Sequence, residues 1–389
     1  MPPRPPLLRV PYTDPLPPPK IIPTSASTPS GAIAALVDFL SPSLPLSTHR
    51  AARPSQHAGK TLLLTGAGIS VASGLADYRG TKGTYTLNKT YRPIYFNEFC
   101  ENHEARKRYW ARSFLGWTTL DKAKPNRAHE ACGELGRMGV VGRLITQNVD
   151  SFHPTAHPHL PTTELHGYLR SLTCLTCHNE YPRRAFQAQL SALNPAWSAF
   201  LAEMLASGAL DTENPVERRN RGLKSNPDGD VDIPGAPYTT FRYPACPVCL
   251  ETPPRRADGS VVRVETDYDG AWDPASEGGV LKPAVIMFGE SIPSATKTAA
   301  EDAVDAAGRL LVVGSSLATY SAWRLVKRAK ERGLPIGVLN VGGVRGEEVF
   351  FGDVGEGNTG REAVRCSESA ERVLPEVVRV LGEVGGRGR

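Results

Sequence analysis

The 389-residue sequence has no apolar run long enough to cross a lipid bilayer. Its longest apolar runs, such as "LITQNV" and "RLLVVG", fall far short of the roughly 20 residues that a membrane helix needs, so no membrane span is expected. Cysteine is scarce as well: there are seven, an odd number, and four of them form two C-x-x-C pairs. This pattern argues against a secreted disulfide framework and favours metal binding in a reducing compartment.

The first sixty residues have few acidic residues and little apolar periodicity. They contain only two acids, Asp14 and Asp38, and begin with the proline-rich stretch "MPPRPPLLRVPYTDPLPPPK", which cannot hold a helix. We predict that residues 1–30 form a disordered or targeting tail that activity does not require, followed by a helix over 31–40. The basic bias is typical of a mitochondrial targeting segment. It predicts a mitochondrial location, with the cytoplasm or the nucleus as alternatives.

The stretch "TLLLTGAGISVASGLADYRG", residues 61–80, lacks part of the glycine pattern of a dehydrogenase. An apolar strand runs into Gly66, Ala67 and Gly68, which is how a Rossmann unit places backbone N–H groups against a pyrophosphate. A dehydrogenase would have a third glycine at position 71 and a ribose-binding acid after a second strand. Position 71 is valine, and the acid comes early, at Asp77. The pattern indicates a dinucleotide site that does not serve hydride transfer.

Strands and helices alternate along most of the chain, which predicts an α/β fold with a doubly wound, parallel, Rossmann-like sheet. Polar residues follow four of the predicted strands, and they should share one edge of the sheet. We assign residues 31–167 and 281–385 to this domain, with a helical and cofactor-loop insertion at about 80–125. Residues 168–255 form a small inserted module, in which 178–245 is predicted to be largely loop-built. The polar strand ends are Gly66–Ser70, Gln147–Asp150, Gly314–Ser316 and Asn340.

The two C-x-x-C pairs predict one structural Zn²⁺ per chain. Four thiolates in a tetrahedral array leave no open coordination position, which is typical of a structural site. The 68 residues between the pairs are more than a usual zinc ribbon contains. Unpaired buried thiols and a nucleic-acid-binding ribbon are the alternatives, but no basic and aromatic alternation surrounds the pairs, so no direct nucleic-acid partner is expected. The ligands are Cys174, Cys177, Cys246 and Cys249.

Two further motifs carry groups that could do chemistry. "TELHGYLR" contains His166, whose ordinary pKa near 6.5 lets it accept a proton at physiological pH. "TQNVD" places the amides Gln147 and Asn148 and the carboxylate Asp150 at a strand end. These groups could hold ribose hydroxyls and a carboxamide. The structural alternatives are a hydrogen-bonded histidine and a helix cap.

In their order along the chain, these motifs resemble those of sirtuins, the NAD-dependent protein deacylases. The resemblance rests on "GAGIS", "GLADYRG", "TQNVD", "ELHG", the two cysteine pairs, "LKPAVIMFGE", "VVGSSL" and "LNVG", and it covers residues 33–380. "RPIYFNEF", "RYWARSFLGW" and "LNPAWSAF" are similar to the class II branch. Some positions depart from the sirtuin pattern: Leu75-Ala76 replaces Ile-Pro, Phe152 replaces Leu, and His157 replaces a common glycine.

The resemblance implies an NAD-dependent acyltransferase that consumes its cofactor. Nicotinamide is expelled from NAD, the acyl oxygen of an acylated protein lysine attacks the ribose, and His166 then deprotonates a ribose hydroxyl. Asn148 acts at nicotinamide release, and the substrate peptide enters as a strand between "MFGE" and the segment after "GSSL". The cofactor-binding residues implied are Gly66, Ala67, Gly68, Asp77, Tyr78, Arg79, Gln147, Asn148, Val149, Asp150, Gly314, Ser315, Ser316, Asn340, Val341, Gly342 and, at the adenine, Cys366.

Three other functions are compatible with parts of this pattern. Protein mono-ADP-ribosyl transfer would use the same cofactor and the same cleavage. An NAD-dependent oxidoreductase would share the fold, but it lacks support from the glycine pattern. A non-catalytic module that binds zinc and NAD would have no need of His166.

Overall fold

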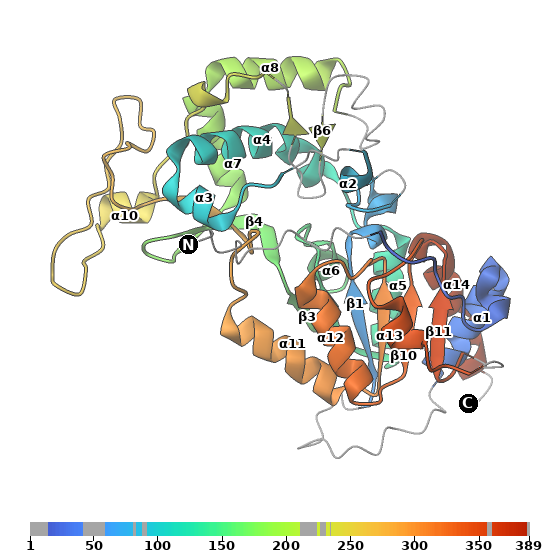
Figure 1. The fold of residues 1–389 in the computed structure, drawn as a ribbon. Helices are drawn as coiled ribbons and strands as arrows, with labels where there is room; N and C mark the ends of the chain where they lie inside the picture. The colour runs from blue at the N-terminus through green and yellow to red at the C-terminus, as the bar shows by residue number, and fades with distance from the viewer. Residues whose placement is uncertain are drawn as a thin grey trace, which may run out of the picture.

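A six-stranded parallel sheet forms the centre of the larger domain (Figure 1). The computed structural model describes residues 15–41, 59–80, 83–87, 92–210, 224–225, 231–233, 235–355 and 360–386. The strand order is β11-β10-β9-β1-β2-β3. The bounds are β1 Thr61–Thr65, β2 Val141–Thr146, β3 Thr162–Glu164, β9 Arg309–Val313, β10 Ile336–Leu339 and β11 Ala363–Cys366.

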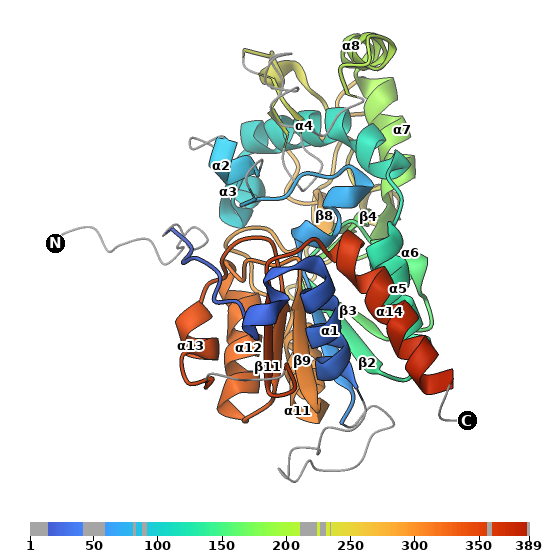
Figure 2. The same cartoon turned by 90° about the vertical axis from the view of Figure 1, so that its right-hand side faces the viewer.

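Helices cover both faces of this sheet, which explains why its strands are apolar throughout (Figure 2). Leu63 of β1 packs toward α1, α5 and α14, whereas its neighbours Leu62 and Leu64 pack toward α11 and α12. The predicted doubly wound parallel sheet is therefore confirmed. The helix bounds are α1 Pro29–Leu40, α5 Arg127–Arg137, α6 Phe152–Ala156, α11 Ser294–Ala306, α12 Tyr320–Glu331, α13 Glu347–Phe351 and α14 Ala370–Gly386.

The smaller domain packs its helices around one shared aromatic core. Trp110, in the helix over 103–122, contacts Phe186, in the helix over 183–193, and their ring centroids lie 4.5 Å apart. Among the described residues, none of the helices combines the length and apolarity that a membrane crossing requires. The elements are α2 Thr84–Leu87, α3 Phe96–Glu101, α4 His103–Lys122, α7 Arg183–Leu193, α8 Pro195–Ala206, α10 Pro247–Glu251, β4 Gly167–Cys174, β5 Glu180–Pro182, β6 Lys224–Ser225, β7 Val231–Asp232 and β8 Leu281–Val285.

Two expectations about this module are wrong. The insert over 178–245 is not largely loop-built, because α7 and α8 bury Phe186, Leu190 and Trp197 in the shared core. Residues 211–223, 226–230 and 234 of that insert lie outside the described residues. The strand at 281–285 also leaves the parallel sheet: it pairs antiparallel with β4 in a separate sheet of order β5-β4-β8. Apolar runs alone do not specify a partner strand, so the sequence could not assign it.

The predicted disorder over 1–30 is wrong for its described part, residues 15–28, which we call the N-terminal strap. The strap lies along the edge of the sheet, where the Ile22 amide donates to the Arg365 carbonyl at 3.0 Å and the Arg365 amide donates back at 2.7 Å. Ile22 is buried. Thr28 then caps α1, because its hydroxyl oxygen accepts from the Gly31 amide at 3.1 Å. Residues 1–14 lie outside the described residues.

The turns after β1 and β9 meet where the strand order reverses direction. The Gly68 amide donates to the Gly314 carbonyl at 2.8 Å. Gly314 has φ +60°, and a Cβ there would lie 2.4 Å from the Ile69 nitrogen. A Cβ on Gly66 would lie 2.7 Å from the Ser315 Cβ. Glycine is therefore required for the two turns to approach each other at the switch point, where α/β sheets bind ligands.

A cluster of buried histidines lies under the turn after β1. His153 on α6 bridges Thr65 and His157: its Nε2 lies 2.9 Å from the Thr65 hydroxyl and its Nδ1 lies 2.9 Å from the His157 Nε2. His129 on α5 packs against His153, with ring centroids 4.9 Å apart. Burial lowers the pKa of His129 to about 3 and that of His157 to about 4, and it holds the pKa of His153 well below its usual range. The three rings are therefore neutral in the folded protein at physiological pH.

The histidine cluster should make the protein sensitive to acid. The folded-state pKa values lie below the unfolded value near 6.5, so between about pH 6.5 and pH 4 the unfolded chain binds more protons and stability falls as pH falls. Each histidine should contribute about 1.4 kcal/mol per pH unit to the slope. Urea unfolding of the wild type and of His157→Gln across this range should show a slope smaller by one proton in the variant. Identical slopes would contradict the assignment.

Candidate active site

The carboxyl ends of the parallel strands open into a cavity of about 410 Å³ between the two domains. This volume lies within the range typical of small-molecule and cofactor sites. The predicted site residues that line it are Gly66, Ala67, Gly68, Asp77, Tyr78, Arg79, Gln147, Asn148, Val149, Asp150, His166, Gly314, Ser315, Ser316, Asn340 and Val341.

His166 is held between two groups that fix its proton. Its Nδ1 lies 3.1 Å from the Gln147 carbonyl oxygen, which can only accept, so Nδ1 carries the hydrogen. Its Nε2, 2.8 Å from the Ser321 hydroxyl, is therefore the acceptor. Burial lowers the pKa of His166 to about 4. The imidazole is neutral at physiological pH and its basic nitrogen lies at the wall of the cavity.

Asn148 and Asp150 meet at Ser70 rather than standing free at the strand end. The Asn148 amide nitrogen donates to the Gly66 carbonyl at 3.1 Å and to the Ser70 hydroxyl oxygen at 3.2 Å. The Ser70 hydroxyl donates to the Asp150 carboxylate at 2.7 Å, and the Phe152 amide donates to its other oxygen at 2.9 Å. Burial raises the pKa of Asp150. This network connects the turn after β1 to the end of β2. It uses the side-chain nitrogen of Asn148, so the side-chain oxygen of Asn148 is the atom of that amide that could accept from a ligand.

Asp77 organises the turn that closes one side of the cavity. Its carboxylate accepts from the Gly80 amide at 2.8 Å, and its burial raises its pKa. A Cβ on Gly83 would lie 2.5 Å from that carboxylate, so the turn folds tightly around it. Arg79 lies over the Tyr85 ring, with its guanidinium carbon 5.2 Å from the ring centroid. Asp77 therefore has a structural role in addition to any contact with a ligand.

Gly342 and Cys366 are the two predicted cofactor residues that do not line the cavity. Cys366 ends β11 and is fully buried in the core with α1 and α14, where burial raises its pKa to about 12. Gly342, with φ +82°, lies two residues beyond Asn340 in the loop after β10.

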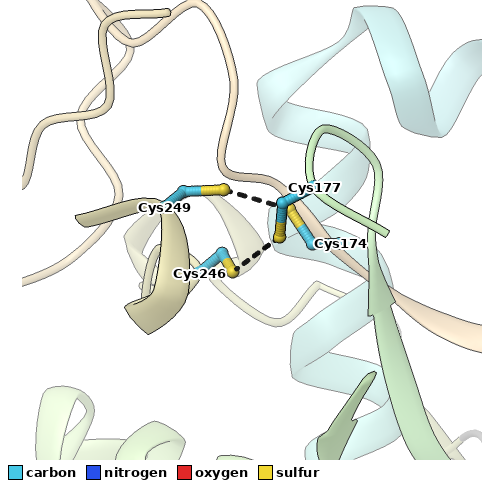
Figure 3. Close-up of side chains that lie close together, drawn as sticks. All are labelled: Cys174, Cys177, Cys246 and Cys249. Atoms are coloured by element: carbon cyan, nitrogen blue, oxygen red, sulfur yellow. Dashed lines mark hydrogen bonds between the residues drawn. The ribbon is translucent and has the colours of Figure 1, made fainter. Parts of the chain in front are cut away.

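The four predicted metal ligands come together where the end of β4 meets α10 (Figure 3). Their sulfur atoms all lie within 4.8 Å of one another. Cys174 lies 3.6 Å from Cys249 and Cys177 lies 3.7 Å from Cys246. Four sulfurs at about 2.3 Å from one zinc ion would be about 3.8 Å apart, close to these two separations, so the cluster fits Zn²⁺. Four thiolates would leave no open position on the metal, and none of the four cysteines lines the cavity, as expected of a structural site.

The comparison with protein families agrees with this geometry. Residues 66–321 match the Sir2 family. The chain therefore belongs to the Sir2 family, the sirtuins.

Individual relatives cover most of the chain. The NAD-dependent protein deacylase SIR4 of Batrachochytrium dendrobatidis is 40% identical over 76% of this chain and 85% of its own. The mitochondrial NAD-dependent protein lipoamidase sirtuin-4 of Bos taurus is 33% identical, over 80% of this chain and 84% of its own. A solved structure from work on the mechanism and regulation of Sir2 enzymes has 25% identity and a TM-score of 0.51. It covers 90% of this chain and 98% of its own.

Sequence reasoning missed the residues that orient the predicted ones. Ser321 contacts His166 across 155 positions of sequence, and Thr319 donates to the Gln147 side-chain oxygen at 2.9 Å. No local motif marks either residue. Ser70 lies within the predicted polar strand end Gly66–Ser70, but its contacts with Asn148 and Asp150 were not predicted.

The cysteine cluster should hold one zinc ion that stabilises the fold. Cys174→Ser should release the metal and lower the melting temperature by about 10 °C, since loss of a structural metal is among the costliest single changes. Metal analysis and thermal unfolding would measure both effects. Cys132→Ser, at a fully buried cysteine outside the cluster, is the matched control and should keep its zinc. Well-folded wild type with less than about half an equivalent of zinc would contradict a closed four-thiolate site.

Proposed function

We propose that this chain is an NAD-dependent protein-lysine deacylase that transfers the acyl group to ADP-ribose and releases nicotinamide. The observation that carries the proposal is His166, a neutral base with a fixed tautomer at the wall of a cavity with the glycine turns of a dinucleotide site. The names of the relatives, NAD-dependent protein deacylases and deacetylases, support the same reaction.

The cavity residues fit NAD by their chemistry. The glycine-rich turns after β1 and β9 meet at the switch point of the sheet and line the cavity, which is where α/β folds hold a pyrophosphate. Asn148 and Asp150 offer oxygen acceptors suited to a carboxamide and to ribose hydroxyls. When bound, NAD supplies a ribose carbon that can exchange nicotinamide for the oxygen of an acyl group, together with free ribose hydroxyls.

The protein's own part is to hold the reactants and to move one proton. Nε2 of His166 accepts a hydroxyl proton while Nδ1–H stays bonded to the Gln147 carbonyl, so the ring keeps its orientation as it becomes charged. Ser321, the present donor to Nε2, has to turn away for a substrate hydroxyl to take its place. Asn148 is held by its amide nitrogen, so its carbonyl oxygen keeps one direction.

The other wall of the cavity suits an acylated lysine. It is formed by apolar side chains from both domains, which would receive the acyl chain and exclude water. Residues 285–287 and 318–319 lie outside the parallel sheet and also line the cavity, and an incoming peptide could pair with them as a strand. The apolar residues are Ile94, Tyr109, Met287, Phe288 and Ile292.

We further place the chain in the class II branch and in the mitochondrion. The similarity to a bovine sirtuin-4 described as mitochondrial supports both assignments, and the basic N-terminal segment supports the second.

The reaction and the order of its steps can be tested together. With NAD and a panel of acyl-lysine peptides, mass spectrometry should detect free lysine peptide and acyl-ADP-ribose. His166→Ala should lower the rate by about 10² to 10⁴, which is typical for loss of a positioned base. Because Asn148 acts before the base, Asn148→Ala should also lose nicotinamide exchange, whereas His166→Ala should retain more of it.

Two outcomes would contradict this scheme. Transfer of ADP-ribose to protein, without acyl-ADP-ribose, would favour the transferase alternative. Deacylation by His166→Ala at close to the wild-type rate would remove the base assignment.

The buried position of His166 also predicts the pH profile. A histidine with its ordinary pKa would lose about tenfold in basic form between pH 7.5 and pH 5.5. Because burial lowers this pKa to about 4, the His166-dependent fall in kcat/KM should come near pH 4 instead. We expect less than a twofold change from this group between pH 7.5 and pH 5.5, with folding checked by circular dichroism. A fall centred on pH 6.5 in folded protein would show that the ring is not desolvated.

A further inference from the structure

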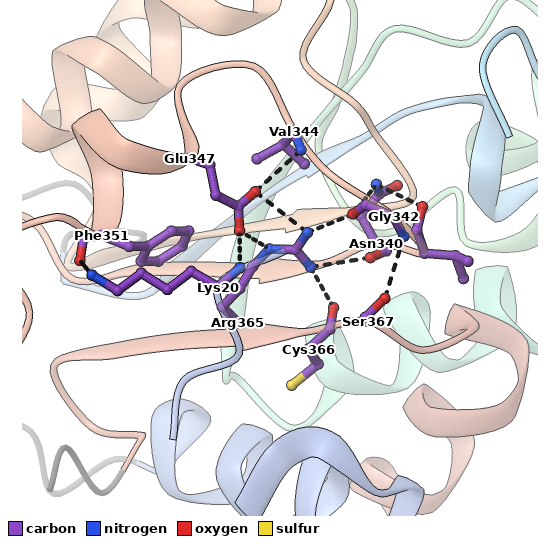
Figure 4. Close-up of polar contacts among 10 residues, drawn as sticks. Lys20, Asn340, Gly342, Val344, Glu347, Phe351, Arg365, Cys366 and Ser367 are labelled. Atoms are coloured by element: carbon purple, nitrogen blue, oxygen red, sulfur yellow. Dashed lines mark hydrogen bonds and ion pairs between the residues drawn. The ribbon is translucent and has the colours of Figure 1, made fainter. Parts of the chain in front are cut away.

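One fully buried ion pair connects the N-terminal strap to the loop after β10, residues 340–344 (Figure 4). Arg365 on β11 has none of its side chain exposed. Its guanidinium donates to the Asn340 carbonyl at 3.1 Å, to the Cys366 carbonyl at 2.7 Å and to the Gly342 carbonyl. Two of these three acceptors, Asn340 and Gly342, belong to the loop, so Arg365 holds the backbone of the loop in one path.

Glu347 holds the other end of the same loop. One carboxylate oxygen accepts from Arg365 Nε at 2.6 Å, and the other accepts from the Val344 amide at 3.1 Å. A buried ion pair is favourable only when its remaining donors and acceptors are satisfied. Here the loop supplies those partners, so its conformation and the burial of the pair depend on each other.

The strap completes this arrangement. The Lys20 amide donates to Glu347 at 2.8 Å, and the Lys20 ammonium donates to the Phe351 carbonyl at 3.0 Å. The strap also lies directly against the loop, because a Cβ on Gly343 would fall 1.7 Å from the Pro17 carbonyl oxygen. The strap therefore contacts both the carboxylate that holds the loop and the loop itself.

The same loop contributes Asn340 and Val341 to the cavity wall. We propose that the strap, through Glu347 and Arg365, positions this loop for the adenosine half of the cofactor. Lys20, Glu347 and Arg365 are positioning residues, because they act on the ligand only through the loop. The inference rests on the proposed function, since it takes NAD to be the ligand.

The proposal limits where the N-terminal segment can be removed. If this segment is a targeting signal, a cut that preserves the site has to fall before Pro17. A cut at residue 60 would remove the strap together with α1, whose Leu36 and Phe39 are fully buried.

A pair of substitutions at Lys20 isolates the backbone contact. Lys20→Ala keeps the amide hydrogen that Glu347 accepts, whereas Lys20→Pro removes it at a position that three prolines already precede. Both lose the contact with Phe351. Calorimetry with ADP-ribose should show binding about tenfold weaker in Lys20→Pro than in Lys20→Ala, the size expected for a hydrogen bond to a charged group. In turnover, KM for NAD should rise while kcat stays within about twofold.

Larger changes need a control for loss of stability. The control for Arg365→Ala is Arg309→Ala. Arg309 is also buried, and its guanidinium also donates to backbone carbonyls, those of Phe39 and Ser41, but at the opposite end of the sheet. Both should lower the melting temperature, but only Arg365→Ala should weaken ADP-ribose binding. Deletion of residues 2–24 should also weaken binding, whereas deletion of 2–14 should not.

The outcomes separate the two proposals. Wild-type affinity in both Lys20→Pro and the 2–24 deletion would overturn the positioning role and leave the proposed function intact. Absence of ADP-ribose binding by the wild type would overturn the proposed function, and this inference with it.

Discussion

The turns after β1 and β9 interlock through backbone contacts that leave no room for side chains, and the rest of the site depends on this approach. With Gly66, Gly68 and Gly314 in contact, the ends of β1, β2, β9 and β10 open onto one cavity. The glycines therefore serve two purposes. They let two turns pack at the switch point of the sheet, and they bring the backbone of both turns to the wall of the cavity. A larger residue at Gly314 would meet both a positive φ and the Ile69 nitrogen.

Desolvation is the second constraint on the site. His166 and the histidines under the turn after β1 are neutral because they are buried, so the base is ready to accept a proton without first losing one. Burial also raises the pKa of Asp77 and Asp150. Pre-organised groups in a dry cavity act more strongly on developing charge than groups in water do. Because the buried histidines are neutral, the folded state loses stability as the pH falls.

The smaller domain and the strap support the site from opposite sides. The zinc cluster closes the end of a module whose aromatic core joins α4 to α7, and β8 of that module leads into the segment 285–290 at the cavity. On the other side, the strap and the Arg365–Glu347 pair hold the loop after β10. The smaller domain and the strap are each connected to the cavity by a short segment of backbone, 285–290 and 340–344 respectively.

The fold class, the four clustered cysteines and most of the cavity residues could be predicted from the sequence, because each has a local signal. Apolar runs identified the strands, glycine and polar residues marked their ends, and the two C-x-x-C pairs have zinc spacing. Tertiary structure decided what such signals cannot encode. It placed the strand at 281–285 in a second sheet, since an apolar run does not name its partner. It also gave α7 and α8 a core through contacts with α4. Cys366 proved to be buried away from the cavity, and the proline-rich strap to be docked on the sheet edge. Ser321, in the first turn of α12, reaches His166 only because the chain after β9 passes beside Gln147 at the end of β2. These features depend on contacts between residues far apart in the chain, whose free energy exists only once the whole fold has formed.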